Sequence, residues 1–301
     1  MVAVLLVVNA AAGARRGPRL ARQLSRELRV RGVAVSVAFT VAGPDADLER
    51  AILDAEVVIA VGGDGTLNRV AGVIIRARRA GRPAPIIGFL PCGTGNVAVR
   101  AFRLPRKVRE IADLVESRTA RTLDAGVVTR DGEVVGIFLL WAGIGIDASL
   151  LETVGVRREQ FHGWRLLAEY AREAIRMSFT YRFPGIELVA EGVSGQFGAV
   201  VVANVGRLIF GSITRAADPS DGKLDVIATK PRRRFGWLRA LSWYGLHRYE
   251  RCSRVTRVLA TAVELRSSTD RVPIHVDGEP IGSLPVQIQV APGCVVLLAP
   301  L

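Results

Sequence analysis

The sequence predicts a chain of two parts: an α/β domain built on a parallel sheet, followed by an antiparallel β-sandwich domain. In the first 122 residues, apolar runs rich in Val and Ile alternate with stretches of helical periodicity, which is typical of βαβ units. Beyond that point, short alternating runs bounded by Gly, Pro or Asp follow one another, as in an antiparallel sandwich. We therefore expect one domain over residues 1–122 and a second over residues 123–290.

The first part carries strand-like runs separated by helical stretches. Leu20, Leu24 and Leu28 recur every four residues between the first two runs, and this stripe predicts an amphipathic helix. Further helices are expected at 46–53 and 68–80, and the expected strands lie at 2–8, 33–39, 57–61 and 85–90.

The second part is dominated by short strands. Two helical patterns interrupt them, at about 161–177 and 235–248. The expected strands lie at 125–129, 133–140, 186–190, 197–203, 224–229, 258–265, 273–276 and 286–290.

Composition excludes several classes of protein. The chain carries 41 Lys and Arg against 28 Asp and Glu, a formal charge of +13, which favours phosphates or anionic surfaces as partners or reflects an arginine-rich genome. No helix-turn-helix, RNP-type or zinc pattern supports nucleic acid as the partner. Three isolated cysteines suggest neither a zinc site nor a disulfide framework, and no 18-residue apolar run predicts a membrane span. We expect a cytoplasmic protein.

The stretch from Val57 to Asn68 carries the strongest functional signal. An apolar run is followed by Gly62, Gly63, Asp64, Gly65, Thr66, Leu67 and Asn68. Glycines let backbone N–H groups approach an anion, and the start of the following helix adds a positive dipole end, so this turn predicts a phosphate cradle. A carboxylate inside such a turn either binds a cation beside the phosphates or accepts a proton from an attacking hydroxyl. Both roles indicate phosphoryl chemistry.

Other polar residues follow neighbouring strands and are expected at the same edge of the sheet. Asn9 and Thr40 end the first two strands, and a second glycine turn, residues 91–96, ends the fourth. Ligands of parallel α/β sheets bind beyond the carboxyl ends of the strands. We therefore expect these segments to surround one site.

Two acidic turns in the second part have alternative interpretations. Residues 218–225 place carboxylates and turn carbonyls close together, as in an oxygen-only Mg²⁺ site, but Pro, Asp and Gly also favour a plain turn. Residues 275–280 place Asp277 and Glu279 around a glycine, as for a general base or for a hairpin.

Taken together, these motifs resemble the diacylglycerol kinase catalytic domain family, which includes bacterial lipid kinases and sphingosine kinases. The string GGDGTLN at 62–68 matches the family closely, and the other motifs lie in the family's order along nearly the whole chain. They are the Asn9 to Gly13 turn, Thr40, the Pro91 to Asn96 turn, the DG turn at 218–224 and the DGE at 277–279.

The resemblance implies a fold related to NAD kinase, with ATP and Mg²⁺ as cofactors and a membrane lipid as acceptor. A final strand near 291–301 would pack back on the first domain. The resemblance assigns proton acceptance to Glu279 or Asp64, and a structural Mg²⁺ to Asp221 with the carbonyls of Asp218 and Lys223. The implied nucleotide contacts are Asn9, Thr40, Gly62, Gly63, Asp64, Gly65, Thr66, Leu67, Asn68, Gly93, Thr94 and Asn96.

Two departures from the family pattern keep other functions open. Arg69 stands where the family usually has Glu, and Val97 stands where Asp is common. The alternatives are a soluble kinase of the NAD kinase type and a catalytically weakened regulator that binds nucleotide or lipid.

Arginines and interfacial aromatics at 232–248 indicate either a surface that docks peripherally on an anionic membrane or a helix packed on the sandwich with a solvated basic face. Residues 157–170 are a second candidate, for which packing on the sandwich is the stronger interpretation.

Overall fold

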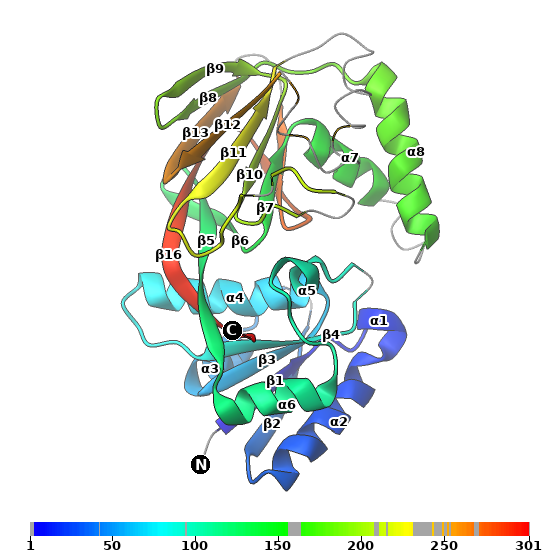
Figure 1. Ribbon diagram of the computed structural model, residues 1–301, viewed down its shortest axis with the longest axis vertical. Helices are drawn as coiled ribbons and strands as arrows, with labels where there is room; N and C mark the ends of the chain where they lie inside the picture. Colours follow the sequence, from blue (N-terminus) through cyan, green and yellow to red (C-terminus); the bar gives the residue numbers. More distant parts are fainter. Residues whose placement is uncertain are drawn as a thin grey trace. The chain divides into compact units, whose positions relative to one another are not determined.

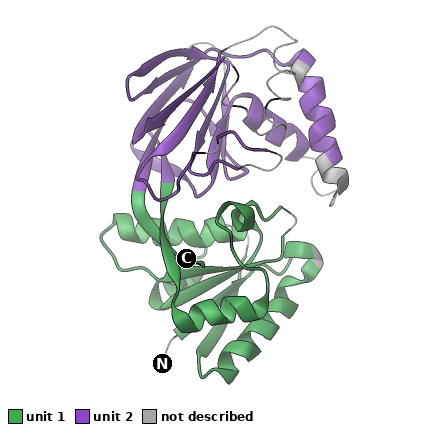
Figure 2. Ribbon diagram, viewed as in Figure 1, with its two compact units in different colours: residues 1–125, 292–301 green, residues 126–291 purple. Residues whose placement is uncertain are grey.

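The protein forms two compact units, which Figure 2 distinguishes by colour. The structure is a computed structural model and describes residues 3–41, 43–93, 95–155, 164–207, 211–214, 216–230, 243, 249, 252, 254–267 and 271–300. Unit 1 contains residues 1–125 and 292–301, and unit 2 contains residues 126–291. Strands β5 (Ala120–Arg130) and β16 (Val286–Leu298) contribute residues to both units.

Unit 1 is an α/β domain on a parallel sheet (Figure 1). Its strands lie in the order β2-β1-β3-β4, and β16 joins β4 in parallel where Leu297 pairs with Ile87. Helices α2 and α6 pack together on the sheet, and α3 packs against α4. The strands are β1 (Ala3–Val8), β2 (Ala34–Phe39), β3 (Val57–Gly62) and β4 (Ile86–Pro91); the helices are α1 (Ala12–Arg15), α2 (Gly17–Val30), α3 (Ala46–Asp54), α4 (Asp64–Arg79), α5 (Val97–Ala101) and α6 (Val108–Ser117).

The core of unit 1 follows from the apolar patterns of the sequence. Every residue of β3 is buried, as expected for a central strand covered on both faces. Leu24 and Leu28 of α2 are fully buried against β1 and β3, which confirms the predicted stripe. The aliphatic core therefore fixes where each strand ends, and the strand ends carry the polar residues of interest.

Unit 2 contains two antiparallel sheets (Figure 1). Among the described residues, one sheet has the order β12-β11-β10-β7-β14-β15, and the other pairs β13 with β16 and β8, and β8 with β9. The strands are β6 (Glu133–Phe138), β7 (Trp141–Ile144), β8 (Ile186–Ala190), β9 (Val193–Phe197), β10 (Ala199–Ala203), β11 (Leu224–Thr229), β12 (Val255–Ala260), β13 (Ala262–Ser267), β14 (Pro273–Val276) and β15 (Glu279–Ser283); the helices are α7 (Ile146–Gly155) and α8 (Trp164–Thr180). An α/β domain followed by an antiparallel sandwich confirms the predicted fold class.

Some predicted boundaries were wrong. The helix expected at 68–80 begins at Asp64, because Gly63 acts as its N-cap and its carbonyl accepts the N–H groups of Thr66 and Leu67. The strand expected at 258–265 is two strands, β12 and β13, which join different sheets. At the break, the Thr261 N–H and hydroxyl both donate to Glu191. Apolar residues recur on both sides of this break, so their pattern could not reveal that the chain changes sheet.

Candidate active site

The phosphate cradle predicted in unit 1 lies between β3 and α4. Gly63 has an extended backbone, with φ −100° and ψ −173°, and Asp64 starts the helix immediately afterwards. The first N–H groups of a helix have no helical carbonyl before them to accept their hydrogen bonds, and they point out of the helix end, where the dipole also favours negative charge. This end of α4 is therefore suited to binding phosphate.

The second glycine turn lies directly against the first. A Cβ placed on Gly93 would lie 2.6 Å from the Cα of Gly63, so only glycine permits this approach. Asn96 closes the second turn in a left-handed conformation, with φ +45°, and its Nδ2 donates to the Gly93 carbonyl at 2.7 Å. The structure thus brings the two predicted turns together. Thr94 of the second turn lies outside the described residues.

Asp64 joins the two turns through its carboxylate. One oxygen accepts the N–H of Val97 at 2.9 Å, and the other accepts the N–H of Ala98 at 3.0 Å. These residues start α5, so Asp64 caps a helix that is distant in sequence. Val97, which departs from the family pattern in its side chain, thus contacts Asp64 through its backbone N–H.

Asn9 and Thr40 lie at the same edge of the sheet, as predicted from the strand ends. The Asn9 side chain donates to the Thr66 hydroxyl at 3.4 Å, which links the end of β1 to the start of α4. The Thr40 N–H donates to the Val8 carbonyl at 2.9 Å and so extends the pairing of β2 with β1.

Arg69 holds the loop that follows Thr40. Its guanidinium donates to the carbonyl of Val41 and, at 2.7 Å, to that of Gly43. A glutamate at this position would present negative oxygens to the same carbonyls. The departure from the family pattern therefore has a structural function in this chain, which is to tie the Thr40 loop to α4.

In unit 2, Asp277 anchors the DGE turn. Its carboxylate accepts the backbone N–H groups of Leu139, Leu140 and Trp141 at 2.8, 3.0 and 2.9 Å. Asp277 and Gly278 both have positive φ, +48° and +89°, which places Glu279 at the start of β15. The Glu279 side chain is exposed, and no hydrogen bond or ion pair holds it within the described part of the chain.

A second DGE, at Asp131, Gly132 and Glu133, escaped the sequence analysis. It forms the turn between β5 and β6 with nearly the same backbone, φ +51° at Asp131 and +84° at Gly132. Asp131 is exposed, however, and among the described residues no N–H group donates to its carboxylate. Only three-dimensional contacts distinguish the anchored turn from the plain hairpin.

His275 contacts the anchored turn and pairs with Asp147, and the sequence analysis missed both residues. The buried His275 places Nε2 2.9 Å from Asp147 Oδ2, while its Nδ1 accepts the Gly278 N–H at 3.3 Å. Trp141 Nε1 also donates to Asp147, at 3.2 Å. Loss of hydration by burial acts to raise the pKa of Asp147. The charge and hydrogen bond of His275 and the hydrogen bond from Trp141 outweigh this effect and lower the pKa. No sequence spacing marks the pair, because its members lie 128 residues apart.

The predicted metal turn is closed by its own carboxylates. Asp218 accepts the Ser220 N–H at 3.0 Å, and Asp221 accepts the Lys223 N–H at 2.9 Å. Both aspartates are exposed, and the described residues hold no cluster of three His, Cys, Asp or Glu side chains that would bind a metal. Each of these bonds uses one carboxylate oxygen, so each aspartate has a second oxygen that neither bond uses. Such a donor set fits Mg²⁺, which binds through one or two carboxylates and retains several waters.

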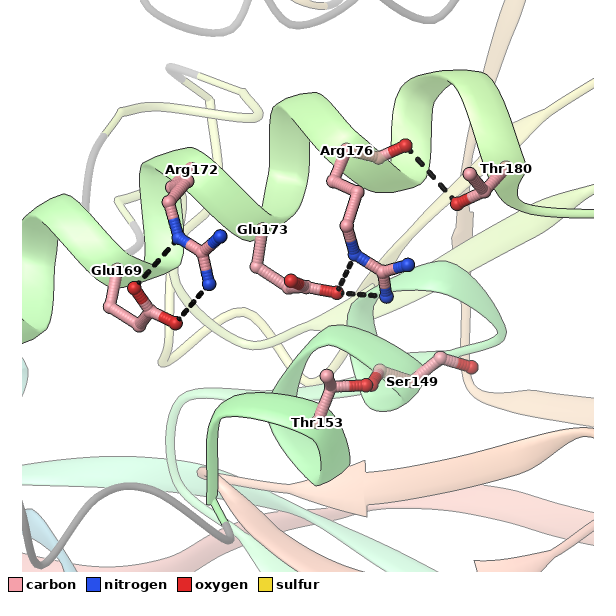
Figure 3. Close-up of polar contacts among 7 residues, drawn as sticks. All are labelled: Ser149, Thr153, Glu169, Arg172, Glu173, Arg176 and Thr180. Carbon is pink, nitrogen blue, oxygen red and sulfur yellow. Dashed lines mark hydrogen bonds and ion pairs between the residues drawn. The ribbon is translucent and has the colours of Figure 1, made fainter.

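The predicted docking segments are only partly covered by the structure. Apart from Trp243, residues 232–248 lie outside the described residues, as do 156–163. In the second candidate, Tyr170 is buried, as expected for packing. Figure 3 shows the arginines farther along α8 paired with glutamates of the same helix, Arg172 with Glu169 at 2.7 Å and Arg176 with Glu173 at 2.5 Å.

Among the helices that the structure describes, none combines the length and apolarity needed to cross a membrane.

Comparisons with known proteins agree with this geometry. Residues 3–128 match the diacylglycerol kinase catalytic domain, and residues 142–299 match the YegS C-terminal NAD kinase beta sandwich-like domain. A protein of Mycobacterium tuberculosis (strain CDC 1551 / Oshkosh) named diacylglycerol kinase is 29% identical over 287 residues, which cover 91% of this chain and 87% of that protein. An Enterobacter sp. (strain 638) protein named "Probable lipid kinase YegS-like" is 36% identical over 127 residues, 41% of each chain.

A crystal structure described as a diacylglycerol kinase of Bacillus anthracis str. Sterne is similar in fold. It covers 99% of this chain and 96% of its own with a TM-score of 0.71 and 18% identity. The two domain matches lie on the two halves of the chain in the predicted order. The chain therefore belongs to the family of kinases that join a diacylglycerol kinase catalytic domain to a YegS C-terminal NAD kinase β-sandwich-like domain.

Proposed function

We propose that the protein transfers the γ-phosphate of ATP to a hydroxyl group of a membrane lipid. The observation that carries this proposal is the cradle of two glycine turns in unit 1, which Asp64 joins at the edge of the parallel sheet. Such a cradle binds phosphate groups, and the family to which the chain belongs consists of kinases. The names of the relatives, diacylglycerol kinase and lipid kinase, support a lipid as the acceptor.

The nucleotide is assigned to unit 1. Backbone N–H groups at the start of α4 bind its phosphates, and Thr40 contacts the nucleotide from the end of β2, just before the loop that Arg69 holds. The full set of proposed nucleotide contacts is Asn9, Thr40, the Gly62 to Asn68 turn, Gly93, Thr94 and Asn96.

Of the two candidate proton acceptors, we assign the role to Glu279. Both carboxylate oxygens of Asp64 already accept N–H groups of α5, so Asp64 positions the second turn rather than taking a proton. Glu279 is exposed on a turn that Asp277 fixes, and nothing in the described part of the chain occupies its oxygens. In the reaction, the lipid hydroxyl oxygen bonds to the γ-phosphorus, the bond to the β-phosphate oxygen breaks, and the hydroxyl proton passes to Glu279.

Mg²⁺ is assigned to the turn at 218–223. The Asp221 carboxylate and the carbonyls of Asp218 and Lys223 would hold it, as the family resemblance implies, and one of the two Asp221 oxygens accepts the Lys223 N–H. This ion would be structural, and a second Mg²⁺, shared with the nucleotide, would neutralise charge on the transferring phosphoryl group.

The lipid acceptor requires contact with a membrane. We propose that the protein acts from the cytoplasm as a peripheral enzyme of lipid metabolism, and that the arginines and aromatics of 232–248 contact the anionic surface.

The test is transfer of labelled γ-phosphate from ATP to a panel of lipids in mixed micelles, with NAD as a further acceptor. The matched variants are Glu279→Gln and Glu133→Gln, which make the same change in the two DGE turns. We expect one lipid to be labelled, a loss of about 10² or more in kcat for Glu279→Gln, and little change for Glu133→Gln.

Other results would overturn specific parts of the proposal. Labelling of NAD alone would identify a soluble kinase, and equal losses in the two variants would remove Glu279 as proton acceptor. ATP binding without transfer to any acceptor would favour a regulator.

A further inference from the structure

A groove lies between α2 and the edge strand β2. Its volume is about 610 Å³, within the range of small-molecule pockets. Arg22, Arg26 and Arg29 line it from α2, together with Val30, while Val37 and Phe39 line it from β2. No acidic side chain lines this groove, whose walls all belong to the described residues. It therefore combines positive charge with an apolar wall.

The three arginines lie on one face of α2 at spacings of four and three residues, so their charges are neighbours. Among the residues that the structure describes, no carboxylate pairs with any of them. Arg22 and Arg29 only donate to the carbonyls of Pro18 and Val35, at 3.4 and 3.3 Å. Like charges at helical spacing repel one another, and an anion in the groove would relieve that repulsion.

Arg31, two residues beyond this face, provides a contrast. It pairs with Glu27, Asp113 and Glu116 at 3.0, 2.7 and 3.1 Å. Carboxylates are thus available to neutralise arginines in this part of unit 1, but they form ion pairs with Arg31 rather than with the arginines of the groove.

The apolar side chains of the groove are unusually exposed. Val30 is 83% exposed, Val37 43% and Phe39 52%. Within the described chain, β2 pairs with β1 alone, so it is an edge strand. In soluble proteins, charged side chains or Pro usually protect edge strands from pairing with other chains, whereas β2 exposes valine and phenylalanine.

We propose that the α2/β2 groove binds an anionic phospholipid of a membrane surface, with the phosphate on the arginines and an acyl chain on Val37 and Phe39. A free phosphate would need no apolar wall. A second copy of the chain would place the same arginines opposite each other, which is unfavourable. This site is additional to the proposed acceptor site and to residues 232–248. It rests on the proposed function only in expecting a membrane partner.

The experiment is sedimentation of the full chain with vesicles, without nucleotide. One set of vesicles is phosphatidylcholine, and the other an equal mixture of phosphatidylcholine and phosphatidylglycerol. The test variant is the double change Arg22→Gln and Arg26→Gln. The matched control is Arg79→Gln and Arg82→Gln, which removes the same charge from exposed positions at the end of α4.

We expect the wild type to prefer the anionic vesicles and the groove variant to bind them about 25-fold more weakly, since each arginine near an anionic surface contributes roughly a fivefold factor. The control should stay within about twofold of the wild type. Val37→Ser should weaken binding, whereas Val189→Ser, at a similarly exposed valine of β8, should not. Unchanged thermal midpoints would show that the variants fold.

Several results would overturn the proposal: equal losses in the groove and control variants, competition by inorganic phosphate at matched concentration, or self-association that the groove variant abolishes. Phosphate transfer in detergent micelles separates the two proposals. A groove variant that still transfers phosphate in micelles but no longer binds vesicles supports the groove. A wild type that transfers nothing but binds vesicles through the groove refutes only the proposed function.

Discussion

The two DGE turns allow a test in which the protein contains its own control. Asp277→Asn and Asp131→Asn make the same chemical change at the same turn position, but only Asp277 accepts backbone N–H groups. An asparagine oxygen at the place of Oδ1 still accepts the N–H groups of Leu140 and Trp141. Its NH₂ group then faces the Leu139 N–H, donor against donor. We expect a loss of about 2–3 kcal/mol in the free energy of unfolding of unit 2, because the lost hydrogen bond had a charged acceptor and leaves a donor unpaired.

The assay is differential scanning calorimetry, with hydrogen exchange of the peptide that carries these three N–H groups. In a domain of this size, a loss of 2–3 kcal/mol lowers the unfolding midpoint by about 5 °C or more. Asp131→Asn should change the free energy by no more than about 0.5 kcal/mol, as for most exposed positions. The reasoning is refuted if the two variants shift the midpoint equally, or if exchange at the three N–H groups is unchanged in Asp277→Asn.

Three further predictions concern single side chains, and one concerns metal binding. Asp64→Ala should destabilise unit 1 by about 3 kcal/mol in urea titrations, because two hydrogen bonds to a charged acceptor are lost; a loss below about 1 kcal/mol would contradict the cap. Arg69→Ala should raise the KM for ATP about three- to tenfold with little change in kcat, since the Thr40 loop loses its two anchors; an unchanged KM would separate that loop from the nucleotide. The lowered pKa of Asp147 means that its contribution to stability is complete above about pH 4 and is lost as the pH falls through the lower folded-state pKa. The difference in unfolding free energy between wild type and Asp147→Asn should therefore shrink only in acid, and a difference that vanishes near pH 7 would be inconsistent. Asp221→Asn should abolish any Mg²⁺-dependent rise in the unfolding midpoint, whereas Asp131→Asn should retain it.

The sequence predicted those features that depend on local pattern. The fully buried β3 and the Leu stripe of α2 are repeated apolar signals, and the core confirms both. The convergence of Asn9, Thr40 and the glycine turns followed from one rule, that parallel strands end at the same edge of a sheet. These predictions needed no knowledge of contacts between distant residues.

Contacts that join distant residues could not be predicted. Nothing near Asp64 indicates that its oxygens cap α5, more than 30 residues away. In the same way, Arg69 differed from the family pattern but gave no sign of its carbonyl partners after β2. The two DGE strings are identical in sequence, and contacts with residues distant in the chain, such as the N–H groups of Leu139, Leu140 and Trp141, distinguish them.

The contacts of Asp64 and Asp277 share one feature that bears on catalysis. In both units a carboxylate within a glycine turn is used to bind backbone N–H groups: Asp64 binds the start of α5, and Asp277 binds the segment before β7. A carboxylate used in this way fixes the position of its turn but has less capacity to accept a proton. The residue that follows such an aspartate turn is then held in a defined place, and its own side chain takes no part in these hydrogen bonds. In unit 2 that residue is Glu279, and this is the physical reason for assigning proton transfer to the exposed member of the DGE rather than to either anchored aspartate.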